Sequence, residues 1–100
     1  MQGKKVTVVA RIKARTGMEE RVKQELLSLV NPTRSEAGCI NYDLHQSTDD
    51  RSHFLFHENW TSKEDLDKHL DMPYLKAFLE KAEAILAEPA EITLWEMIST

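Results

Sequence analysis

Two side chains in this sequence combine acid–base chemistry with positions that should bury them. His69 follows Leu66 by three residues and precedes Leu70 in a segment with helical spacing, so it should face inward. An imidazole can take up or release a proton near neutral pH. We therefore predict that His69 is a catalytic base or stabilises an anion. The alternative is a helix-end histidine that is hydrogen-bonded to backbone.

The second candidate is Glu58, which alternates with aromatic residues in an extended segment. It shares strand parity with Phe54, Phe56 and Trp60, so it is an acid among three aromatic rings on one face. A buried carboxylate needs a partner or stays protonated. Glu58 could orient His69 or bind a substrate hydroxyl. The alternative is a structural carboxylate bonded to an arginine, a backbone amide or a helix cap.

Aromatic residues around these two groups could form the wall of a binding pocket. Trp60, Phe56, Phe54 and Tyr42 offer flat rings that suit a flat aromatic substrate, because rings stack with offset geometry and lose little conformational entropy. The alternative is that they only fill the core. The face on which Tyr42 lies is left open, because shifting the pairing of two strands by one residue moves every side chain to the other face.

Cysteine and the remaining histidines give weaker signals. A nucleophilic thiol at Cys39 would need an activating base or cation, and none can be assigned from the sequence, so we interpret Cys39 as a small buried residue. His53 and His57 are four residues apart on a predicted strand, roughly 13 Å, which is too far for both to bind one metal. With His45, they are expected at the surface or an interface, and no metal site is predicted.

The elements that must position these side chains follow from hydrophobic periodicity. Alternation with a period of two predicts strands, and apolar spacing of three and four predicts helices. Thr61 or Ser62 can cap the second helix, with Glu64 or Asp65 completing a capping box. The predicted strands cover residues 4–14, 38–47, 52–60 and 92–98, and the predicted helices cover 18 to about 32, 62–70, and 72 to before 89. The order βαββααβ predicts an α+β, ferredoxin-like fold with an antiparallel sheet.

The first and last strands carry apolar residues at both parities. Val8 alternates with Val9, and Leu94 with Trp95. A sheet covered by helices on one side should show one polar parity. We therefore expect a second subunit to cover the face that the helices leave open; the alternative is a monomer whose sheet is apolar on both faces.

Composition limits the class of protein. The 100 residues fit a single domain, 1–100, with 41% hydrophobic and 30% charged residues. The net charge of −4 comes without a basic block, so nucleic acid is not an expected partner. No apolar run is long enough to span a membrane and no signal peptide is evident, so no membrane partner is expected and a cytoplasmic location is predicted. A single cysteine agrees with a reducing compartment.

The segment from Glu36 to His69 resembles the antibiotic biosynthesis monooxygenase (ABM) domain. The resemblance rests on Glu36-Ala37-Gly38-Cys39-Ile40-Asn41-Tyr42, Phe54-x-Phe56-x-Glu58-Asn59-Trp60, Ser62-Lys63-Glu64-Asp65 and His69. It implies a homodimeric α/β barrel of ferredoxin-like subunits, and oxidation of phenols or quinols without flavin, haem or metal. It also implies that polar side chains between sheet and helices contact the substrate, with a histidine frequent at the position of His69.

These observations lead to one main hypothesis and two alternatives. The main one is a cofactor-independent monooxygenase that oxidises a small quinol or phenol with O2, in which His69 is the base, Glu58 orients it and Trp60 stacks on the ring. A related subfamily suggests an isomerase of a phosphorylated signalling sugar, which needs a cationic or helix-N-terminal phosphate site to which Arg11, Arg34 or Lys76 could contribute. The third hypothesis is a non-catalytic dimer that binds a small ligand.

Overall fold

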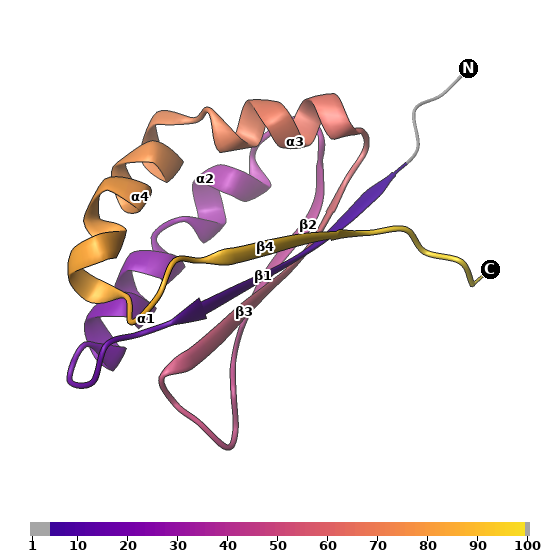
Figure 1. The fold of residues 1–100 in the computed structure, drawn as a ribbon. Helices are drawn as coiled ribbons and strands as arrows, with labels where there is room; N and C mark the ends of the chain where they lie inside the picture. The colour runs from indigo at the N-terminus through magenta and orange to yellow at the C-terminus, as the bar shows by residue number, and fades with distance from the viewer. Residues whose placement is uncertain (1–4, 100) are drawn as a thin grey trace.

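One antiparallel sheet of four strands, in the order β2-β3-β1-β4, forms the base of the fold (Figure 1). The computed structural model describes residues 5–99. The strands are β1 (Val6–Lys13), β2 (Cys39–Gln46), β3 (His53–Trp60) and β4 (Glu91–Trp95). The predicted start of the first strand at Lys4 lies outside the described residues.

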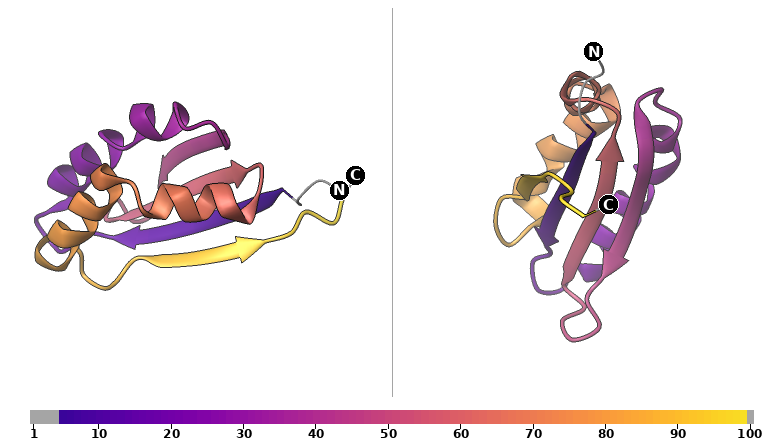
Figure 2. Two further views of the ribbon diagram at one scale, coloured as in Figure 1. Left: turned by 90° about the horizontal axis from the view of Figure 1, so that it is seen from above. Right: turned by 90° about the vertical axis from the view of Figure 1, so that its right-hand side faces the viewer.

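Helices cover one face of this sheet only, as the views in Figures 1 and 2 show. They are α1 (Glu19–Leu27), α2 (Val30–Arg34), α3 (Lys63–Leu70) and α4 (Pro73–Ile85). The predicted α+β, ferredoxin-like fold is thus confirmed, with each crossover placing its helices on the same side. Within residues 5–99, none of the helices has the length and apolar content that crossing a bilayer requires.

Two predicted boundaries were wrong. The helix predicted to run to Pro32 stops at Leu27, and a separate short helix, α2, contains Pro32 as its third residue. Proline is tolerated there because the first amides of a helix have no intrahelical partner. The last strand ends at Trp95 rather than Ile98, because its pairing with β1 ends at the Thr7–Trp95 pair.

The core lies between the sheet and the helices. Period-two alternation places Val8, Ala10 and Ile12 of β1 toward the helices, where all three are buried. The helices contribute apolar side chains at helical spacing, as the sequence predicts. The buried helical residues include Val22, Leu26, Leu66, Leu75 and Phe78.

The pairing of β2 with β3 fixes the register that the sequence left open. Tyr42 lies opposite Glu58, and an irregularity between Cys39 and Asn41 places one extra residue, Ile40, in β2. Tyr42 therefore faces the helices and is buried, whereas Ile40 is exposed. This β-bulge at Ile40 therefore places Tyr42 on the same face of the sheet as Glu58.

The helix-free face of the sheet is more polar than expected. It comprises Thr7, Val9, Arg11, Lys13, Asn41, Asp43, His45, His53, Leu55, His57, Asn59, Thr93 and Trp95. The prediction of an apolar second face was therefore only partly right. In β4, Leu94 lies on the helix side and Trp95 on the helix-free face, as the alternation predicts, whereas Met97 and Ile98 lie beyond the strand.

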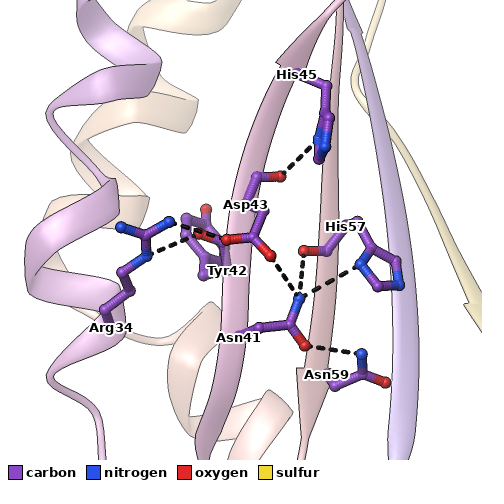
Figure 3. Close-up of polar contacts among 7 residues, drawn as sticks. All are labelled: Arg34, Asn41, Tyr42, Asp43, His45, His57 and Asn59. Carbon is purple, nitrogen blue, oxygen red and sulfur yellow. Dashed lines mark hydrogen bonds and ion pairs between the residues drawn. The ribbon is translucent and has the colours of Figure 1, made fainter.

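A hydrogen-bond network ties this polar face together (Figure 3). The Asn41 amide nitrogen donates to an Asp43 carboxylate oxygen at 3.0 Å and to the backbone carbonyl of His57 at 3.0 Å. Asn59 donates to the Asn41 carbonyl at 2.8 Å, and Arg34 of α2 reaches Asp43 at 2.9 Å. Asn41, Asp43 and Asn59 on this face therefore have hydrogen-bond partners within the same chain.

Candidate functional site

His69 lies at the centre of a buried group of polar side chains. Its Nδ1 is 2.9 Å from Oε2 of Glu36, which lies in the loop between α2 and β2. The hydroxyl of Tyr74 on α4 donates to the same oxygen. The side chains of His69 and Glu36 are 3% and 8% exposed. Because an ionised carboxylate can only accept hydrogen bonds, Nδ1 carries the hydrogen and Nε2 is left able to accept a proton.

Aromatic rings pack around His69. Its ring centroid lies 4.7 Å from that of Trp60 and 5.4 Å from that of Tyr42. Tyr42 in turn stacks on Phe56 with centroids 4.4 Å apart. The inward orientation predicted for His69 is thus observed. The face of Trp60 that was expected to stack on a substrate is in contact with His69 instead.

Glu58 is buried, and its partner is not His69. Its Oε1 accepts a hydrogen bond from the Trp60 indole nitrogen at 2.9 Å. Burial raises the pKa of Glu58 to about 7; the Trp60 hydrogen bond lowers it in part, and the charge of Glu36 raises it further. The orienting contact that the sequence analysis assigned to Glu58 is made by Glu36. Burial therefore makes Glu58 hold its proton to a higher pH than an exposed glutamate does.

An apolar space between sheet and helices, here called the inner cavity, connects these groups. Its lining includes Tyr42, Phe56, Glu58 and His69, together with aliphatic residues of β1, α1, α3 and α4. Trp60 and Phe54 lie outside this lining. The free volume is about 40 Å³. A water needs roughly 10–15 Å³ on the same measure, so the inner cavity at this volume holds small molecules only.

The start of α3 fixes the position of His69. The predicted cap is confirmed: Ser62 Oγ accepts from the Asp65 amide at 3.2 Å and donates to the Asp65 carboxylate at 3.0 Å. Asp65 also packs so closely on Gly38 that a Cβ at position 38 would overlap the Asp65 side chain. Glycine at position 38 therefore lets the first turn of α3 sit against the start of β2.

Glu36 and Tyr74 belong to this site, and the sequence analysis gave neither of them a role. Glu36 stands first in the segment that carries the family resemblance, but it lies in a loop, 33 residues before His69. Tyr74 is 38 residues from Glu36, in the first turn of α4. No periodicity marks either residue, because a loop and a helix start have no face that a pattern could reveal.

The other candidate residues lie away from the inner cavity. Burial raises the pKa of the Cys39 thiol to about 11, with the charges of Glu36 and Glu58 adding to the effect, so the thiol is protonated at neutral pH. His45, His53 and His57 lie on the helix-free face. Among the residues that the structure describes, no three histidine, cysteine, aspartate or glutamate side chains converge in a way that could hold a metal ion.

The cations expected for a phosphate site do not come together. Arg11 lies on the helix-free face opposite Leu55, and its guanidinium is 3.9 Å from Glu91. Arg34 is bound to Asp43 and to the carbonyl of Tyr42, and Lys76 lies 3.5 Å from Asp71. None of these three cations lines the inner cavity.

The chain thus folds as a ferredoxin-like α+β protein with a buried histidine–carboxylate pair next to an apolar cavity. The sequence matches the family model described as "Antibiotic biosynthesis monooxygenase" (ABM) over residues 5–81. The chain therefore belongs to the ABM family.

Known relatives agree with this assignment. Protein sll1783 of Synechocystis sp. is 34% identical over 95 residues; the match takes in 95% of this chain but spans only 65% of the relative's length. "Putative monooxygenase Rv0793" of Mycobacterium tuberculosis is 32% identical over 89 residues, 89% of this chain and 87% of the relative. The crystal structure of PA3566 from Pseudomonas aeruginosa superposes with a TM-score of 0.93 at 32% identity, covering 99% of both chains.

Proposed function

We propose that this protein is a monooxygenase that oxidises a small quinol or phenol with O2 and needs no cofactor. The observation that carries the proposal is the buried His69–Glu36 pair, in which His69 lines the same apolar cavity as Glu58, a carboxyl whose pKa burial raises to about 7. The ABM family and the name of the mycobacterial relative support an oxidation. In such a reaction one oxygen atom enters the ring and the other leaves as water.

The substrate itself supplies the electrons in this proposal. A deprotonated dihydroxyarene passes an electron to O2 more readily than its neutral form does, so the protein has to remove a proton and stabilise the anion. His69 takes the phenolic proton at Nε2. Glu36 holds the ring through Nδ1 and stabilises the imidazolium that forms, in the manner of a carboxylate behind a catalytic histidine.

Glu58 and the aromatic rings have separate parts in the proposal. In its protonated form, Glu58 donates a hydrogen bond to a substrate oxygen, and the indole of Trp60 holds the other carboxyl oxygen. Tyr42 and Phe56 line the inner cavity and offer their ring faces to a flat substrate. Trp60 supports both His69 and Glu58 and does not itself stack on the substrate.

A homodimer in the cytoplasm completes the proposal. The partner subunit covers the helix-free face, on which Val9, Leu55 and Trp95 are the apolar contacts. Burying polar groups is costly only when they lose their hydrogen bonds. On this face Asn41, Asp43 and Asn59 already bond within the subunit, so covering them leaves few polar groups unsatisfied.

Oxygen uptake tests the reaction. Purified protein is assayed over a panel of hydroquinones and naphthols with a metal chelator present. We expect saturable uptake above autoxidation, reduced by roughly 10²- to 10⁴-fold in His69→Ala, the range for loss of a general base. Lys68→Ala, which changes an exposed side chain next to His69 on α3, is the matched control and should keep full activity. Uptake no faster than autoxidation across the panel would contradict the proposal.

One observation favours a second candidate, a non-catalytic dimer that binds a small ligand. Trp60 and His69 are in contact, so no space separates them, and the inner cavity is small. Under this alternative the protein binds the same aromatic compounds without consuming oxygen. Calorimetric titration of the panel under nitrogen, followed by oxygen uptake on the compounds that bind, separates the two functions.

A further inference from the structure

The inner cavity adjoins a second, larger hollow. This outer groove lies between the C-terminal half of α4 and the segment of residues 86–90 that leads into β4, a region that can be followed in Figure 1. Leu79, Ala90 and Ile92 line both the inner cavity and the outer groove. The two hollows therefore meet at a shared wall of three apolar side chains.

The sizes of the two hollows differ in a way that bears on the substrate. The inner cavity has about 40 Å³ of free volume and the outer groove about 430 Å³. An apolar cavity of roughly 150 Å³ takes up benzene, and ligand sites generally measure roughly 300–1,000 Å³. The outer groove thus has the volume of a ligand site, whereas the inner cavity holds the chemical groups and must widen to admit a ring.

Widening the inner cavity should cost the least free energy at the shared wall. Leu79 is 45% exposed and Ile92 is 43% exposed, so neither side chain is fixed by complete packing. Phe78 and Leu75, on the buried side of the same helix, are 5% and 8% exposed. A ring that enters between Leu79 and Ile92 displaces two partly packed side chains and leaves the core of α4 in place.

The chemistry of the outer groove favours hydrocarbon. Ala82, Leu86 and Pro89 add to the apolar surface of its wall. Its charged lining residues are Arg15, Glu83 and Glu88, and an Arg15 Nη2 donates to the backbone carbonyl of Glu83 at 2.8 Å. The groove therefore has two carboxylates and a single guanidinium, which is already hydrogen-bonded. This balance of charge disfavours an anionic ligand group.

We propose that the outer groove binds an uncharged alkyl or alkenyl substituent of the substrate, while the ring of that substrate lies in the widened inner cavity near His69 and Glu58. The inference rests on the proposed function and narrows its substrate class to hydrocarbon-substituted quinols or phenols. Burial of each methylene in the groove should strengthen binding by about fourfold at most.

Calorimetric titration under nitrogen tests this assignment with two probes, 1-naphthol and 4-hexyl-1-naphthol. The wild-type protein should bind the hexyl compound at least tenfold more tightly than naphthol. Ala87→Trp, which fills the outer groove from an exposed position, should remove this gain and leave the affinity for naphthol unchanged. Ala84→Trp is the matched control, because Ala84 is exposed in the last turn of α4, three residues before Ala87, and lines neither hollow.

A second variant guards against a local rearrangement of the segment after α4. Ala82→Phe fills the groove from the helix side and should also abolish the gain, with folding checked by circular dichroism. Equal affinity of the wild-type protein for the two naphthols would overturn the assignment. So would a gain that survives in both groove variants, or one that Ala84→Trp abolishes as well.

Oxygen uptake keeps this inference distinct from the proposed function. A hexyl-dependent gain in affinity that the groove variants remove, with no oxygen uptake on either probe or across the panel, contradicts the monooxygenase and upholds the groove. Uptake on naphthol that His69→Ala abolishes, with no affinity gained from the hexyl chain, upholds the monooxygenase and overturns the groove.

Discussion

Glu36 holds His69 through a hydrogen bond of 2.9 Å to Nδ1, across 33 residues of sequence. The pair joins a loop to the last turn of α3, and both side chains are almost fully buried. Second partners support each member: Tyr74 donates to the carboxylate, and the Trp60 ring packs on the imidazole. The geometry therefore fixes which nitrogen of His69 carries the hydrogen.

Replacing Glu36 by glutamine should remove the preference of His69 for the tautomer with hydrogen on Nδ1. A glutamine amide can present either its oxygen or its NH2 group to Nδ1, so His69 loses its preference for the Nδ1–H form. Nitrogen NMR of the imidazole should show one tautomer in the wild-type protein and a mixture in Glu36→Gln. Activity on an accepted quinol should fall roughly tenfold or more, since the imidazolium loses its counter-charge.

Tyr74→Phe is the control for this change. It removes the phenol and leaves the Glu36 carboxylate in place, so the Nδ1–H tautomer should persist. An unchanged tautomer in Glu36→Gln would show that the carboxylate does not orient His69.

Glu58 should make the protein less stable as the pH rises. Its pKa is raised from an ordinary 4.5 to about 7, so between these values the unfolded chain releases the proton while the native state keeps it. Unfolding is therefore favoured progressively across this window, by up to about 3 kcal/mol, and the effect is complete above about pH 7.

Denaturant unfolding of the wild-type protein and Glu58→Gln across pH 4 to 8 measures this effect. The glutamine variant has no carboxyl to titrate, so the difference in the free energy of unfolding should shift in favour of the variant between about pH 4.5 and 7. A difference that stays constant over this range would mean that Glu58 titrates normally in the folded protein.

Gly38→Ala should destabilise the fold and loosen the start of α3. The added Cβ overlaps the Asp65 side chain, which must move and give up its contacts with Ser62. We expect a loss of about 1–3 kcal/mol in the free energy of unfolding, the usual range for overpacking. Ala37→Ser, at the exposed neighbouring position, should have little effect. Equal stability of both variants would rule out the close approach.

Cys39 should be unreactive in the folded protein. With a pKa of about 11, about one thiol in a thousand is ionised at pH 8, and the side chain is partly buried. Labelling by a thiol-specific disulfide reagent should be at least a hundredfold slower than that of free cysteine, and denaturant should restore it. Cys39→Ser should keep its activity. Rapid labelling of the native protein would point to an activated thiol.

In the proposed dimer, a charged residue at position 55 should weaken the association of the two subunits. Leu55 lies on the helix-free face, where a buried glutamate would lack a partner, so Leu55→Glu should weaken association. Sedimentation equilibrium should show a wild-type dimer and a largely monomeric variant. Leu27→Glu, a change of the same kind at an exposed position on α1, is the control and should stay dimeric. A wild-type monomer at all concentrations would contradict the proposed assembly.

The sequence by itself determined the fold class and the side of the sheet on which the main candidates lie. Strand alternation placed Glu58 with Phe54, Phe56 and Trp60, and helical spacing turned His69 inward, because these periodicities are local properties of the backbone. The cap at Ser62 was equally readable, since a cap needs only the residues of one helix turn.

Only the tertiary structure decided which groups meet. A bulge at Ile40 set the register that buries Tyr42, and the packing of a loop and two helices brought Glu36 and Tyr74 to His69. The Trp60 indole nitrogen donates to Glu58, and its ring packs on His69, so the indole is not open to a substrate. The contacts of Glu36 with His69 and Tyr74 join residues far apart in the chain, and their energies depend on burial and distance, which no local pattern encodes.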